Sequence, residues 1–138
     1  MSDLDTLIDA ARAAAEHAYA PYSHFRVGAA ARTADGRVFT GCNVENASYG
    51  ATICAERNAI FQMVAAGARR LDTLVIYTAT NTPAAPCGIC RQVMAEFGPQ
   101  ARVVSVCDSD TRLDRTVAEL LPDAFGPGDL SHDPLENA

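Results

Sequence analysis

The chain has 138 residues, of which 49% are hydrophobic and 20% charged, and its formal net charge is −6. The length favours a single domain over 1–138, and the apolar fraction argues against disorder. An acidic chain lacks the basic surface that nucleic acid polymers require, so we exclude them as partners. Because the chain has neither a bilayer-length apolar run nor a signal-peptide pattern, we expect a cytoplasmic protein with no membrane partner.

The N-terminal third predicts one helix followed by a β-hairpin. Apolar residues recur at helical spacing over 3–19, which predicts an amphipathic helix. Strand-like segments over 25–33 and 37–44 flank Asp35 and Gly36. This dipeptide is typical of hairpin turns because both residues tolerate positive φ.

Helices and buried strands alternate in the middle of the chain. A loop over 45–53 precedes a segment over 54–66 in which apolar residues recur at helical spacing, which predicts a helix. Residues 87–97 are predicted to form a second helix. The segments 73–80 and 101–107 are predominantly apolar, as in strands that are covered on both faces.

The last segments complete an α/β pattern. We predict an edge strand over 112–117 and a short helix over 118–125. Residues 126–138 are rich in Pro, Gly and Asp, and we expect a tail that is mobile or docked on a neighbouring subunit. Because strands alternate with helices, a central sheet should carry helices on its faces.

Three of the five cysteines form the pattern that most clearly indicates a metal site. Cys87 and Cys90 make a C-x-x-C pair where one helix begins, and Cys54 stands where the preceding helix begins. Helix N-termini lower the pKa of thiols, and thiolates are the form that binds zinc. Three sulfurs leave a tetrahedral Zn²⁺ with one open position, as in catalytic sites.

Two other uses of the cysteines fit less well. Cys42 or Cys107 could close a four-cysteine structural site, but Cys107 ends a buried strand. Cys42 alternates along its strand with a polar neighbour that faces the other way. A redox C-x-x-C pair would leave Cys54 and Glu56 without a role.

Charged residues accompany these cysteines. Glu56 follows Cys54 by two positions, from where its carboxylate can reach the open metal position and move protons between water and a substrate. The alternative role for Glu56 is to complement the helix dipole. Arg57 and Arg91 each follow a candidate ligand; a guanidinium on a sulfur would offset thiolate charge, whereas the alternative is a solvated surface cation.

Motifs that together cover nearly the whole chain carry a family resemblance. They are AYAPYSHFRVGAA (18–30), GCNVENASYGATICAERNAI (41–60), APCGICRQVMAEF (85–97) and ELLPDAF (119–125). In these motifs, above all C-A-E followed by P-C-x-x-C, the chain resembles the short-chain, homotetrameric, zinc-dependent cytidine deaminases that act on nucleosides. The resemblance implies a three-layer α/β/α fold with a central mixed five-stranded sheet.

The resemblance also implies a reaction. Cys54, Cys87 and Cys90 would hold one Zn²⁺ per subunit, with a water in the fourth position. Glu56 would pass protons from that water to the pyrimidine while the water attacks C4. Cytidine and 2′-deoxycytidine would then give uridine and 2′-deoxyuridine with release of ammonia, a reaction of pyrimidine salvage.

The resemblance further implies how the substrate is held. Phe25 and the backbone of Ala55 would contact the base, and Asn43 and Glu45 would hold the ribose 3′-OH. Two aromatic residues would complete the pocket of a neighbouring subunit in the homotetramer, namely Tyr49 and Phe125.

Two other functions share part of this pattern. Blasticidin-S-type antibiotic deaminases combine the same cysteine and glutamate motifs at similar length, but the stretch NVENASY favours a nucleoside ribose. A non-catalytic, zinc-stapled binding module would need the cysteines and not Glu56. A nucleotide deaminase would be expected to carry histidine at position 54 and cations for the phosphate.

Overall fold

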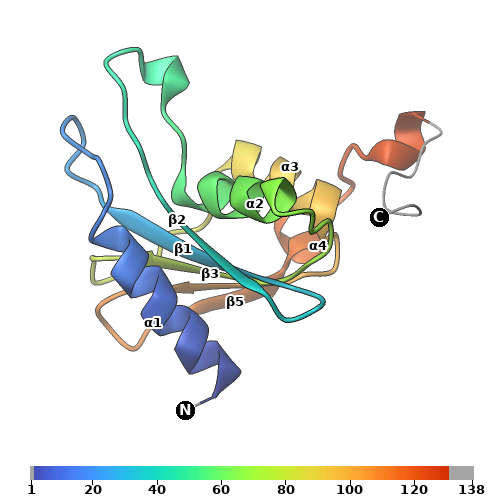
Figure 1. Ribbon diagram of the computed structural model, residues 1–138, viewed down its shortest axis with the longest axis horizontal. Coiled ribbons are helices and arrows are strands. Elements are labelled where there is room, and N and C mark those ends of the chain that lie inside the picture. Colours follow the sequence, from blue (N-terminus) through green and yellow to red (C-terminus); the bar gives the residue numbers. More distant parts are fainter. Residues whose placement is uncertain (1, 131–138) are drawn as a thin grey trace.

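The computed structural model describes residues 2–130, which form one five-stranded sheet with helices on both faces (Figure 1). The strand order is β2-β1-β3-β4-β5. β3 and β4 run parallel, and the other neighbouring pairs are antiparallel. The predicted α/β fold with a central mixed five-stranded sheet is therefore confirmed.

The longest connections between helices and strands, over 16–26 and 79–87, precede β1 and α3. The strands are β1 (Val27–Thr33), β2 (Val38–Cys42), β3 (Leu71–Thr78), β4 (Arg102–Val106) and β5 (Leu113–Thr116). The helices are α1 (Asp3–Ala15), α2 (Ala55–Ala65), α3 (Gly88–Phe97) and α4 (Val117–Leu120), with short 3-10 helices η1 (Tyr49–Ala51) and η2 (Pro127–Leu130). The predicted tail is described only as far as η2, and its remainder, 131–138, lies outside the described residues. No helix within 2–130 has the length and apolar character needed to cross a membrane.

Helix α1 covers one face of the sheet. Ser2 caps it in a capping box, with Asp5 N donating to Ser2 Oγ over 3.1 Å and Ser2 N donating to the Asp5 carboxylate over 3.2 Å. The helix ends four residues before the predicted boundary at 19. The reason is tertiary, because Tyr19 N donates to Asn43 O over 3.0 Å and thereby pairs the chain with the segment after β2.

Helices α2, α3 and α4 lie on the opposite face of the sheet (Figure 1). α2 approaches β2 closely because residue 41 is glycine: a Cβ there would lie 2.5 Å from Ala59 N. α2 ends at Ala65, one residue before the predicted boundary at 66. Gly67 follows the C-cap residue, and its φ of 92° allows Ala68 N to donate to Met63 O over 3.1 Å. This contact belongs to a Schellman motif, which satisfies carbonyls at the helix end.

The predicted hairpin of β1 and β2 is confirmed, but its turn differs from the expectation. Only Gly36 adopts a positive φ, 91°, whereas Asp35 does not. Asp35 instead accepts hydrogen bonds from the hydroxyl of Thr33 and the guanidinium of Arg37. The carboxylate thus stabilises a longer turn over 34–37, closed by Thr33 N donating to Arg37 O over 2.8 Å.

Candidate metal centre and substrate cavity

The three predicted zinc ligands meet between the N-termini of α2 and α3. Cys54 and Cys87 are the N-cap residues of these helices, and neither side chain is used for capping. With Cys90, from the first turn of α3, their Sγ atoms all lie within 4.8 Å of one another. The Sγ atoms of Cys54 and Cys87 are 3.8 Å apart.

These distances suit a tetrahedral zinc ion. Thiolates at a Zn–S distance of about 2.3 Å lie about 3.8 Å apart on a tetrahedron. Within residues 2–130, the three cysteines are the group of metal-ligating side chains that the fold gathers, and Cys42 and Cys107 are not part of it. Cys107 lies elsewhere, with its Sγ 3.2 Å from Ser109 Oγ. The residues present therefore fit Zn²⁺ with one open position.

Arg57 contacts the sulfur cluster directly. Its Nη2 donates to Cys54 Sγ over 3.4 Å. A hydrogen bond with Cys90, followed by that with Arg57, lowers the pKa of Cys54 to about 5. The same pairing with Cys54, together with burial, raises the pKa of Cys90. The cluster thus favours a negative charge on Cys54 even before a metal ion binds.

Glu56 is a buried carboxyl group beside the sulfurs. Only 6% of the residue is exposed, and it lines a cavity of about 180 Å³ together with Cys54 and Cys87. Burial, with a contribution from the charge of Cys54, raises the pKa of Glu56 to about 7. A carboxyl group with a pKa near neutrality can both accept and donate a proton, as general acid–base catalysis requires.

The same cavity brings several predicted substrate contacts together. Phe25, Asn43 and Ala55 line it with the metal-site residues. The end of β3 forms a wall that the sequence had not singled out, made by Ile76 and Thr78. The sequence did not mark these two residues as functional, because the apolar character of their strand is already explained by its burial in the sheet.

Glu45 does not line the cavity, but Asn43, two residues before it, does. Asn43 Nδ2 donates to Phe25 O over 2.7 Å, and Asn43 Oδ1 accepts from Val27 N over 2.9 Å. Glu45 Oε1 accepts from Tyr22 N over 2.9 Å. The two side chains predicted to share a face therefore both contact the segment before β1.

The remaining predicted site residues do not line this cavity. Arg91 donates from Nε to Pro86 O and from Nη1 to Leu120 O, each over 2.8 Å, so its guanidinium holds backbone carbonyls. Tyr49 and Phe125 are 75% and 60% exposed and are not among the residues that line the cavity. Their expected contribution to a second subunit stays a prediction.

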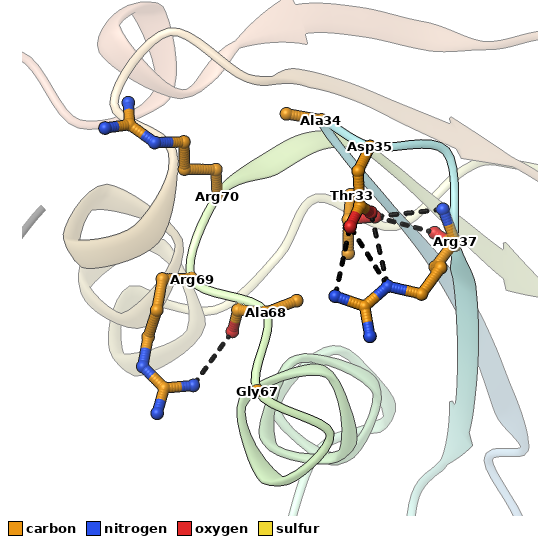
Figure 2. A pocket seen from close by; sticks show the side chains of 8 residues that line it. All are labelled: Thr33, Ala34, Asp35, Arg37, Gly67, Ala68, Arg69 and Arg70. Carbon is orange, nitrogen blue, oxygen red and sulfur yellow. Dashed lines mark hydrogen bonds and ion pairs between the residues drawn. The ribbon is translucent and has the colours of Figure 1, made fainter. Parts of the chain in front are cut away.

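A second cavity, of about 190 Å³, lies at the other end of β1 (Figure 2). Three of its eight lining residues are arginines, but Arg37 pairs with Asp35 over 3.1 Å and Arg69 donates to Val64 O over 2.8 Å. These cations are already used in local contacts. The site chemistry is therefore concentrated in the cavity that contains Glu56.

Comparisons with known proteins agree with this geometry. The model of the "cytidine and deoxycytidylate deaminase zinc-binding region" matches residues 1–107. The chain is 44% identical to the cytidine deaminase of Sporosarcina psychrophila over 131 residues, which cover 94% of this chain and 96% of that protein. It is 46% identical to the cytidine deaminase of Mycobacterium tuberculosis over 128 residues, 93% of each chain. The crystal structure of a cytidine deaminase from Burkholderia pseudomallei is similar with a TM-score of 0.85 and 52% identity, covering 91% of this chain and all of that one.

Proposed function

The chain belongs to the cytidine and deoxycytidylate deaminase family, and from this premise we propose that it deaminates both cytidine and 2′-deoxycytidine by hydrolysis. The observation that carries the proposal is the position of Glu56, a buried carboxyl group in one cavity with the sulfurs of a three-cysteine cluster. A zinc-stapled binding module has no use for a buried carboxyl group there, because its burial costs free energy.

Cys54, Cys87 and Cys90 hold the metal ion in this proposal. When bound, Zn²⁺ supplies Lewis acidity at its open position, which makes a water molecule acidic enough to react at neutral pH. Glu56 accepts a proton from the attacking water and donates it to N3 of the base. The water oxygen bonds to C4. Glu56 then takes the proton of the resulting C4 hydroxyl group and passes it to the amino group, so that the C4–N4 bond breaks, the C4 carbonyl forms and ammonia leaves.

Side chains that line or flank the cavity orient the nucleoside. Phe25 packs against the base, and the small residue Ala55 lets the backbone approach the base edge. Asn43 and Glu45 hold the ribose 3′-OH, which both proposed substrates possess. Support for this assignment comes from the position of Asn43 in the cavity wall and of Glu45 one strand repeat further along.

We further propose a homotetramer in which Tyr49 and Phe125 complete a neighbouring subunit's pocket. Both rings are exposed, at 75% and 60%, as expected for aromatic residues that a partner covers. We also propose that the reaction serves pyrimidine salvage in the cytoplasm.

The decisive experiment offers the purified, zinc-loaded protein five substrates and follows ammonia release with and without a chelator. The substrates are cytidine, 2′-deoxycytidine, cytosine, CMP and blasticidin S. We expect conversion of the first two and loss of conversion on chelation. Failure to convert both nucleosides would overturn the proposal, and selective conversion of blasticidin S would replace it with the antibiotic deaminase function.

A further inference from the structure

The carboxylate of Glu45 is held by the loop over 21–25, which precedes β1. Glu45 Oε1 accepts from Tyr22 N over 2.9 Å and from Ser23 N over 3.1 Å, and Oε2 accepts from the Ser23 hydroxyl. Three donors from two consecutive residues therefore fix both oxygens of one carboxylate. Since a carboxylate has about four acceptor positions, one position on Oε2 remains for an additional donor.

The same hydroxyl also fixes the backbone of Phe25. Phe25 N donates to Ser23 Oγ over 3.0 Å, so Ser23 Oγ accepts from Phe25 while it donates to Glu45. The carbonyl of Phe25 is held from the other side by Asn43 Nδ2 over 2.7 Å. The Phe25 carbonyl is thus bonded directly to Asn43, and the Phe25 N–H is connected to Glu45 through the Ser23 hydroxyl.

Asn43 keeps hydrogen-bonding capacity in this arrangement. Its amide donates once, to Phe25 O, and accepts once, from Val27 N. One N–H and one lone pair remain, because the side-chain amide offers two of each. Asn43 and Glu45 can therefore serve a hydroxyl group between them without giving up their contacts to the loop.

The loop adopts a costly backbone conformation in making these contacts. His24, between Ser23 and Phe25, has a φ of 58°, in the left-handed region that non-glycine residues seldom occupy. Such a conformation persists where the surrounding contacts determine it, and it often occurs at ligand-binding sites. Ser23 itself is exposed, so core packing does not explain the arrangement.

We propose that Ser23 is a positioning residue that couples the ribose contact of Glu45 to the base contact of Phe25. The proposal rests on the assignment of Glu45 to the ribose 3′-OH under the proposed function. Its hydroxyl holds Glu45 Oε2 with one acceptor position directed to the substrate and keeps the Phe25 ring in place through the backbone. Loss of the hydroxyl should weaken recognition of the 3′-OH more than the chemistry at C4.

The test compares 2′-deoxycytidine with 2′,3′-dideoxycytidine, which differ only in the 3′-OH. For wild type, we expect kcat/KM to be far higher on 2′-deoxycytidine. Ser23→Ala should lower kcat/KM on 2′-deoxycytidine about 10-fold, mainly through KM, because one hydrogen bond to a charged group is lost. Its efficiency on 2′,3′-dideoxycytidine should change much less, so the preference for the 3′-OH shrinks.

Conservative and remote variants separate positioning from folding. Ser23→Thr keeps the hydroxyl and should retain the preference. Ser2→Ala removes an equivalent contact, in which Ser2 Oγ donates to the Asp5 carboxylate over 2.9 Å far from the cavity, and should lower stability without altering the preference. If Ser23→Ala does not fold, Ser23→Cys, which keeps the side-chain size but donates weakly, gives the same comparison.

The outcomes distinguish the two proposals. A wild type that converts neither cytidine nor 2′-deoxycytidine contradicts the proposed function. A wild type that prefers the 3′-OH and a folded Ser23→Ala variant with an undiminished preference overturn the role of Ser23 alone. A wild type that is active but indifferent to the 3′-OH removes the ribose assignment of Glu45 and with it this inference.

Discussion

Arg57 Nη2 donates a hydrogen bond to Cys54 Sγ over 3.4 Å, one helical turn after the thiol. Its Nε is buried and has no hydrogen-bond partner among the described residues. The cation thus contacts a cluster of three sulfurs, which would leave a bound Zn²⁺ with a net charge of −1. Arg57 can offset this charge without acting as a ligand.

Arg57→Gln should weaken zinc retention or turnover by about 10- to 100-fold, as expected for a residue that contacts a metal ligand. Zinc content after dialysis against a chelator and kcat on cytidine measure the two effects. Arg69→Gln is the matched control, because Arg69 lies beyond the other end of α2 and donates to Val64 O and Ala68 O. Unchanged zinc retention and turnover in Arg57→Gln would contradict the role.

Glu56→Gln should keep the metal and lose the reaction. The carboxamide preserves the volume of the buried side chain but cannot accept the proton of water, so kcat should fall by about 10³-fold or more. Elemental analysis should show one zinc per chain in both proteins. Retention of wild-type turnover by a zinc-loaded Glu56→Gln variant would favour a mechanism that does not use Glu56.

Arg91→Met tests the connection between the metal centre and the C-terminal segment. Arg91 donates to the carbonyls of Pro86, which precedes Cys87, and Leu120, which ends α4. Loss of both contacts should lower the unfolding free energy by about 2–3 kcal/mol. Faster amide hydrogen exchange over 117–125 together with faster zinc loss would support the connection. Wild-type exchange and zinc retention would show that the contacts have no such effect.

The lowered pKa of Glu45 predicts how the stability of the protein depends on pH. The hydrogen bond from the Ser23 side chain, with backbone hydrogen bonds from Ser23 and Tyr22, lowers the pKa of Glu45 below its ordinary value of 4.5. Because the folded pKa is lowered, this interaction stabilises the protein above the unfolded value and is lost as the pH falls through the folded value.

In Ser23→Ala, the pKa of Glu45 should therefore return toward 4.5, which carboxyl NMR titration measures directly. The stability difference between wild type and variant should be constant near neutral pH and shrink below about pH 4. Ser2→Ala is the control, since it should move the pKa of Asp5, which Ser2 lowers, and leave Glu45 unchanged. A Glu45 titration that is identical in wild type and Ser23→Ala would refute the contact.

Gly41→Ala should destabilise the protein by about 3 kcal/mol, because overpacking a closely fitted backbone contact forces the chain to move. The added Cβ would lie 2.5 Å from Ala59 N and 2.7 Å from Ala55 O, so α2 must shift away from β2. Urea unfolding measures the loss, and zinc affinity should fall with it because Cys54 begins α2. Gly50→Ala is the control, since no atom lies within 4 Å of a Cβ built there.

The metal ligands could be predicted from sequence because each lies at a helix start, although 33 residues separate Cys54 from Cys87. Cys87, Cys90 and Glu56 lie within one turn of a helix start, and a helix start is readable from flanking residues. Arg91 also follows a ligand, but its partner Leu120 is 29 residues away, so spacing alone suggested a sulfur contact where the guanidinium holds carbonyls. The tertiary fold, which brings Leu120 next to Arg91, therefore determines what the guanidinium binds.

On the ribose side of the cavity, too, sequence spacing predicts contacts only between residues that are close along the chain. Side-chain direction in an extended chain has a period of two, which predicts that Asn43 and Glu45 share a face. Both side chains contact the segment around the start of β1. Ser23 was missed, since its contact with Glu45 depends on a loop that turns through a positive φ at His24. Histidine occupies this region only occasionally, so its presence at position 24 does not by itself predict the turn.

Cys54 and Cys87, the N-cap residues of α2 and α3, are separated by 33 residues along the chain. An ion held by both would cross-link the polypeptide and close a loop that contains all of α2 and β3. By the chain-entropy argument used for disulfides, closing a loop of this length removes about 4 kcal/mol of unfolded-state entropy. The catalytic zinc ion would then also be a reversible cross-link that stabilises the fold. Loss of zinc would therefore lower the enzymatic activity and also shorten the lifetime of the folded chain.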